Sequence, residues 1–175
     1  MARAHRAGGA LAQAATALST LVSPLGRGRV AEVEALNRAA IVLLSAHLEG
    51  YLEDLYAEAA SSLLRGRVKD LLSLVADGQE MFRNPQPGHV ERLFRSIGLP
   101  KVLERVSWQR ATNDSVRKRL SDYTDIRNKI AHGEREIRVR KSKVVGFKKF
   151  VRVFAEKFDE KVRSEIQAVT GHPPW

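Results

Sequence analysis

The segment from Ala31 to about Leu64 is the feature that most limits how this chain can fold. Its apolar residues recur at steps of three and four, which is the period of an α-helix. The set is too broad for one narrow stripe, so the segment predicts a central helix that packs against several neighbours. The positions in phase are Leu36, Ala40, Leu43, Leu44, His47, Leu48, Tyr51, Leu52, Leu55 and Ala59.

Two further segments predict the other long helices. One runs from about Ser115 to His132, follows several possible N-cap side chains and ends at Gly133. The other can begin with Ser142 as its cap, and we assign its apolar stripe to the core rather than to a platform for nucleobases. That stripe consists of Phe147, Val151, Phe154, Phe158, Val162, Ile166 and Val169.

Shorter elements are expected between these helices. The pattern predicts helices at 10–21, at 68–75 before Asp77-Gly78, and at 90–97 before Gly98, with a loop at 84–88 and a new start after Pro100. No strand alternates convincingly, so the chain predicts an all-α, antiparallel bundle with short additional helices. We divide it into an Ala-rich helix and turn at 1–30, which belong to the same fold, a helical domain at 31–170 and a tail at 171–175.

Composition restricts the classes of function. The 175 residues fit one domain, and the net charge of +10 favours a polyanionic partner such as RNA. Zero cysteines and five scattered histidines predict no metal site and no cofactor. No apolar run approaches the roughly 20 residues that span a bilayer, so we expect a cytoplasmic protein without a membrane partner. Residues 1–31 hold arginines and no acid, which leaves an organellar transit peptide as an alternative.

The stretch from Asp125 to Gly133, Asp-Ile-Arg-Asn-Lys-Ile-Ala-His-Gly, carries the candidate chemistry. At about 100 degrees per residue, Arg127 falls on the apolar face of its helix, where a guanidinium needs an acidic partner or a polar cleft. Glu49 and Glu53 on the central helix are the candidate partners.

Asn128 and His132 fall on the other face, one turn apart. Either the helix loosens near Gly133, or a site combines residues of two protomers across a two-fold interface, which we favour. Histidine titrates near neutral pH, so His132 can act as a general base or acid while Arg127 or Asn128 holds a phosphate. A purely structural reading, with an internal salt bridge and a helix cap, stays open.

A basic run follows the motif. Between Arg135 and Arg152 the chain has eight basic residues and one acid, Glu136. Such a run is often only a solvated face, but beside a phosphate site it would attract an RNA backbone. The expected RNA-binding residues are Arg138, Arg140, Lys141, Lys143, Lys148 and Lys149.

The residues Arg127-Asn-Lys-Ile-Ala-His-Gly133 resemble the R-N-x-x-x-H signature of HEPN domains. The stretch from Leu36 to Leu55 resembles the early helix of the RiboL-PSP-type branch of these domains. The resemblance covers roughly residues 30–165. It implies a four- to five-helix bundle, a homodimer with both motifs at its interface, and metal-independent endoribonuclease activity. By position, Arg127 and His132 would be catalytic, Asn128 supporting, and Glu49 the acid beside the arginine.

The sequence therefore predicts a ribonuclease that uses the 2′-hydroxyl of RNA as its nucleophile. The resemblance also implies a toxin-antitoxin or antiphage setting, with an antitoxin or other inhibitory protein as a further partner. The alternative is a non-catalytic helical module that binds nucleic acid or a protein and uses the motif only to stabilise a dimer.

Overall fold

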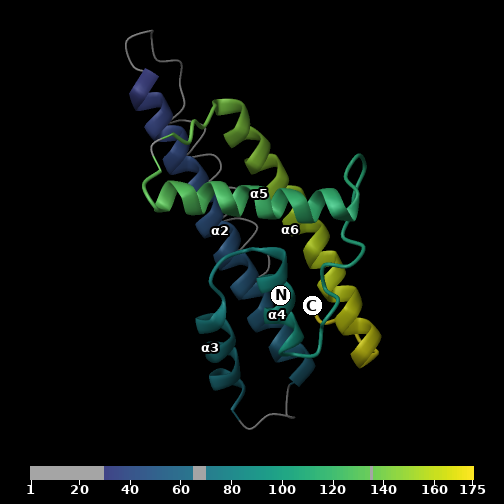
Figure 1. Ribbon diagram of the computed structural model, residues 1–175. Helices are drawn as coiled ribbons and strands as arrows, with labels where there is room; N and C mark the ends of the chain where they lie inside the picture. Colours follow the sequence, from purple (N-terminus) through teal and green to yellow (C-terminus); the bar gives the residue numbers. More distant parts are fainter. Residues whose placement is uncertain (1–29, 65–69, 135) are drawn as a thin grey trace.

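The computed structural model describes residues 30–64, 70–134 and 136–175, and the helix expected at 10–21 lies outside them. The described residues form five helices and no strand beyond an isolated bridge between Trp108 and Ala111. The all-α prediction is confirmed. The long helices are α2 (Val30–Leu64), α5 (Asn113–Ala131) and α6 (Lys141–Thr170), and the short ones are α3 (Leu71–Met81) and α4 (Pro87–Arg95) (Figure 1).

Helix α2 is the centre of the bundle. It packs against α3, α4, α5 and α6, and its most extensive contact is with α6. Because neighbours surround it, residues such as Ile41, Leu48 and Leu52 are fully buried. The central helix predicted from the period of the segment is confirmed, although Leu43, one of its expected apolar positions, is 47% exposed.

Helices α2 and α6 begin at the same end of the molecule, α5 lies across them, and α3 and α4 cover the other end of α2 (Figure 1). Tyr51 of α2 donates a hydrogen bond to the carbonyl oxygen of Ala155 in α6 at 2.8 Å. This arrangement brings the residues just before α6 next to the first turns of α2.

The aromatic stripe of α6 is core, as predicted. Phe147, Phe154 and Phe158 are at most 1% exposed, and the Phe154 and Phe158 rings stack at 5.2 Å. The stripe ends one turn earlier than expected, because Val169 is 62% exposed. The predicted cap was also wrong: Arg140 occupies the N-cap position, and no side chain caps the helix.

The middle elements differ most from expectation. Helix α3 begins after Asp70, whose carboxylate accepts from the Ser73 amide at 2.9 Å, and it continues through Gly78, where a stop was predicted. Gly78 is needed inside the helix because a Cβ there would overlap the ring of Tyr56. Helix α4 begins at Pro87, inside the predicted loop, since proline suits the first turn of a helix.

The chain between α4 and α5 continues after Pro100 as a series of turns. Val102, Leu103 and Val106 are buried there, as their apolar character suggests. Across the described helices, none is long and apolar enough to cross a membrane.

Candidate functional site

Helix α5 carries the motif and has a defined end. Thr112 caps its start through a hydrogen bond from the Ser115 amide. At the other end the Gly133 amide donates to the Ile130 carbonyl and the Glu134 amide to the Lys129 carbonyl, both at 3.0 Å. This is a Schellman closure, which requires a left-handed residue, and Gly133 has φ of +77°. The helix therefore stays regular up to the histidine.

Arg127 lies on the face of α5 that meets α2. Its Nη2 is 3.5 Å from Oε1 of Glu49, and the two side chains are only 28% and 19% exposed. Of the two surroundings predicted for Arg127, an acidic partner or a polar cleft, the structure has the acidic partner. Of the two candidate acids, the structure brings Glu49 into ion-pair distance.

The environment of Glu49 works against its charge. Burial raises the pKa of its carboxyl above 4.5, Arg127 opposes that shift, and neighbouring Glu53 adds to it. Oε1 also has no hydrogen-bond donor in the described structure, so the 3.5 Å approach is an ion pair without hydrogen-bond geometry. The acid is thus incompletely compensated.

Asn128 and His132 lie differently from Arg127. The Asn128 side-chain oxygen accepts from Nη1 of Arg127 at 3.1 Å, so the arginine contacts both an acid and an amide. His132 is the C-cap residue of α5 and is exposed, and its amide donates to the Asn128 carbonyl. Within the described residues no hydrogen bond joins the Arg127 and His132 side chains.

The loop before α4 is tied to the same helix. Gln86 donates to the Asp125 carboxylate at 2.8 Å and accepts from the Ser121 hydroxyl at 2.9 Å. Both partners lie on the face of α5 that continues to Asn128. The sequence showed only a Pro-rich loop there, without a sign of this contact.

The basic run is placed mainly on the surface. Lys148 is half-buried, whereas the other expected RNA-binding residues are exposed: Arg138, Arg140, Lys141, Lys143 and Lys149. Lys141 and Lys148 each take part in an interaction within the protein. The Lys143 ammonium lies 5.0 Å above the centre of the Tyr123 ring.

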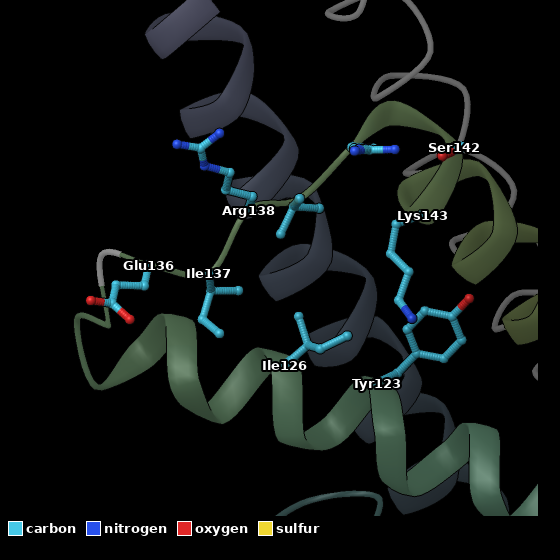
Figure 2. Close-up of a pocket in the computed structure, with 9 residues that line it drawn as sticks. Tyr123, Ile126, Glu136, Ile137, Arg138, Ser142 and Lys143 are labelled. Carbon is cyan, nitrogen blue, oxygen red and sulfur yellow. The ribbon is translucent and has the colours of Figure 1, made fainter.

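A cavity of about 580 Å³ adjoins α5. Figure 2 shows it between α5, residues 136–140, which we call the connector, and the first turn of α6. Ile126 rises into it from α5, Ile137 faces it from the connector, and Lys143 reaches down to Tyr123 (Figure 2). Arg138 points to the side of the connector away from α5.

Two residues of α2 hold the connector and were assigned no role from the sequence. Nδ2 of Asn37 donates to the Val139 carbonyl at 2.9 Å, and Arg38 donates to the carbonyls of Ile137 and Glu134. Asn37 is 3% exposed, and its own Oδ1 has no partner in the described structure. The sequence could have indicated a role for Asn37, because it is a polar residue in phase with the buried positions of α2.

The described residues contain no group of three His, Asp or Glu side chains placed to hold a metal ion. Comparison with curated proteins and with solved structures gives no match. The model of the RiboL-PSP-HEPN family matches residues 10–164, which includes most of the N-terminal segment that the motifs alone left unmatched. Membership of the HEPN family suggests a function related to nucleic acids, often that of a ribonuclease. The chain therefore belongs to the RiboL-PSP branch of the HEPN family.

Proposed function

We propose that this protein is a metal-independent endoribonuclease whose active site contains Arg127, Asn128 and His132. One observation supports this most directly. The Arg127 guanidinium is held between Glu49 and Asn128, while His132 is exposed at the end of the same helix. A positioned cation and an exposed imidazole are the two groups that cleavage of RNA through its own hydroxyl requires.

The chemistry follows from these groups. His132 takes the proton of the 2′-hydroxyl, whose oxygen attacks the adjacent phosphorus as the bond to the 5′-oxygen breaks. Arg127 and Asn128 stabilise the negative charge on the phosphoryl oxygens. The departing 5′-oxygen takes a proton from water, and His132 releases its own proton to solvent, which gives a 2′,3′-cyclic phosphate and a free 5′-hydroxyl. DNA lacks the attacking hydroxyl and would not be cleaved.

The site is proposed to be completed by a second protomer. Arg127 is on the face of α5 toward α2, whereas His132 is exposed beyond the last turn. A two-fold axis near the end of α5 would bring two copies of the motif together across one isologous interface. The arginine and histidine that act on one phosphate can then come from different chains.

Purified protein incubated with labelled single-stranded RNA in EDTA tests the activity. We expect cleavage by the wild type and a loss of at least about 100-fold in His132→Ala and in Arg127→Ala. His172→Ala and Lys118→Ala are matched controls, since they remove an exposed histidine and an exposed cation of α5 outside the motif. Intact RNA with the wild type, or equal losses in the control variants, would reject the enzyme.

Mixing the two inactive variants tests the shared site. If subunits exchange, Arg127→Ala and His132→Ala chains together form heterodimers with one complete site, and activity should recover to at most about half. Exchange is verified independently with differently labelled chains. Exchange without any recovery would show that each site uses one chain only.

A restrained toxin or an antiphage nuclease is the biological role we propose for this activity. Cleavage of cellular RNA would be harmful, so expression in a bacterium should arrest growth, and His132→Ala should not. Growth arrest that is equal for both proteins would separate toxicity from the chemistry.

A non-catalytic module is the second candidate. It is favoured by the observation that Arg127 already contacts Glu49 and Asn128, as an internal structural residue would. In that case Arg127→Ala would weaken the fold or the dimer, while RNA would stay intact with every variant. Thermal unfolding and RNA cleavage, measured on the same samples, separate the two candidates.

A further inference from the structure

The cavity beside α5 combines apolar walls with a basic rim. Ile126 and Ile137 supply the aliphatic surface, and Tyr123 supplies an aromatic ring. Lys143 and Arg140 lie at the rim and are exposed, whereas Glu136 is the only acid among the described residues that line the cavity. This is the combination that single-stranded nucleic acid requires, with a flat surface for a base and cations for the backbone.

We infer that this cavity binds one unpaired nucleobase of the RNA, next to the nucleotide whose phosphate is cleaved. The inference rests on the proposed ribonuclease function and adds a base-binding subsite to it. An acidic peptide is the less suitable occupant, because the aliphatic side chains of Ile126 and Ile137 offer a carboxylate no partner.

Only one face of the Tyr123 ring could stack on a nucleobase. Phe147 covers the other face, with ring centres 4.0 Å apart and an interplanar angle of 17°. The Lys143 ammonium lies 5.0 Å from the ring centre, and Tyr123 is only 9% exposed while Lys143 stays there. Lys143 is exposed, so it can swing away, let a base take its place on the ring, and pair with the adjoining phosphate.

The wall opposite α5 is held in place before any ligand binds. Asn37 fixes Val139, and Arg38 fixes Ile137, both through main-chain carbonyls. A cavity whose wall is already ordered loses little conformational entropy when a base enters. The connector therefore acts as a rigid side of the subsite.

Its position suits a nucleotide that adjoins the scissile phosphate. Ile126 directly precedes Arg127 on α5, and His132 is six residues further, which is about 9 Å along a helix axis. Glu136 marks the end of the cavity nearest the motif (Figure 2). RNA that lies along α5 would contact both places at once.

The test uses RNA oligonucleotides in which one nucleotide at a time lacks its base. Binding is measured by fluorescence anisotropy with His132→Ala protein, which keeps the cavity and should leave the RNA uncut. We expect removal of one particular base to weaken binding about tenfold, while removal of more distant bases changes it little. Equal effects at every position would overturn the inference.

Two cavity-filling variants link that base to this cavity. Ile137→Trp and Ser142→Trp should each bind intact RNA about as weakly as the parent binds the sensitive abasic RNA, and should no longer distinguish the two. Ser142 is exposed, so its variant keeps the test valid if the first one misfolds. Val145→Trp is the matched control, because it adds the same ring to an exposed position of α6 outside the cavity and should retain the tenfold discrimination.

The outcomes also separate the subsite from the enzyme. Wild-type cleavage in EDTA without any base-sensitive position would refute the subsite and leave the ribonuclease intact. Base-sensitive binding that is lost in both cavity variants, without any cleavage, would support the subsite and refute the enzyme. If an oligoglutamate peptide binds and is excluded by both cavity variants, whereas RNA binding is not affected, the occupant is a peptide and the inference is wrong.

Discussion

Replacing Glu49 with glutamine separates the stability of the fold from the proposed chemistry. The carboxylate lies 3.5 Å from the Arg127 guanidinium, and at an effective dielectric constant near 20 their attraction is about 5 kcal/mol. Removing the charge from water costs several kcal/mol, and Oε1 lacks a hydrogen-bond donor in the described structure. Burial raises the pKa of Glu49 more than the Arg127 charge lowers it, and Glu53 raises it further, so the cost of burial outweighs the attraction.

The contribution of Glu49 to stability depends on pH. The folded pKa of Glu49 lies above 4.5, so its contribution to stability is fully present below that pH and is lost as pH rises through the folded pKa. Glutamine resembles the protonated acid at every pH. Glu49→Gln should therefore match the wild type near pH 4 and unfold with a free energy about 1 kcal/mol higher near pH 7.5.

Urea unfolding, followed by circular dichroism at both pH values, measures this difference. Asp54→Asn is the control, because it makes the same change at an exposed position of α2 and should alter stability by less than about 0.5 kcal/mol. RNA cleavage by Glu49→Gln should fall about tenfold, since a neutral amide orients Arg127 less firmly. A variant that loses stability relative to the wild type as pH rises would refute this account of the pair.

Other substitutions test the parts that position the site. Gly133→Ala should lower the free energy of unfolding by about 1 kcal/mol, because φ of +77° suits glycine. Gly50→Ala should raise the free energy of unfolding by up to about 1 kcal/mol, because an added Cβ meets nothing within 4 Å inside α2. Equal shifts of the thermal unfolding temperature in the two variants would contradict this. Gly78→Ala should destabilise through its overlap with Tyr56, and thermal unfolding unchanged from the wild type would show that the ring can move. Asn37→Leu should speed hydrogen exchange across 136–140 and lower the free energy of unfolding by about 1–3 kcal/mol, because the Val139 carbonyl loses its hydrogen-bond donor. Unchanged hydrogen exchange at 136–140 would mean that other contacts hold the connector.

Periodicity predicted the long helices because each buries a continuous apolar surface that is visible in its own residues. The errors occurred where a distant residue decides the outcome. The residues around Gly78 predict the end of a helix. The Tyr56 ring, however, occupies the space beside Gly78, so a glycine is suitable inside α3. The start of α6 reads as a capped helix at Ser142, but Arg140 takes that position, directly after Val139 is fixed by Asn37 of α2.

The same division applies to the candidate site. Helical phase was sufficient to place Arg127 on the apolar face of its helix and to require an acidic partner or a polar cleft. Glu49 and Glu53 are one turn apart, and only the packing of α5 on α2 selects between them. The cavity could not be predicted from neighbouring residues in the sequence, because its connector is held by hydrogen bonds that link residues about a hundred positions apart. Those bonds start at Asn37 and Arg38, on the helix that also carries Glu49. One helix thus positions both the arginine of the proposed active site and the wall of the proposed base subsite, so a substitution that shifts α2 should change cleavage rate and base preference together.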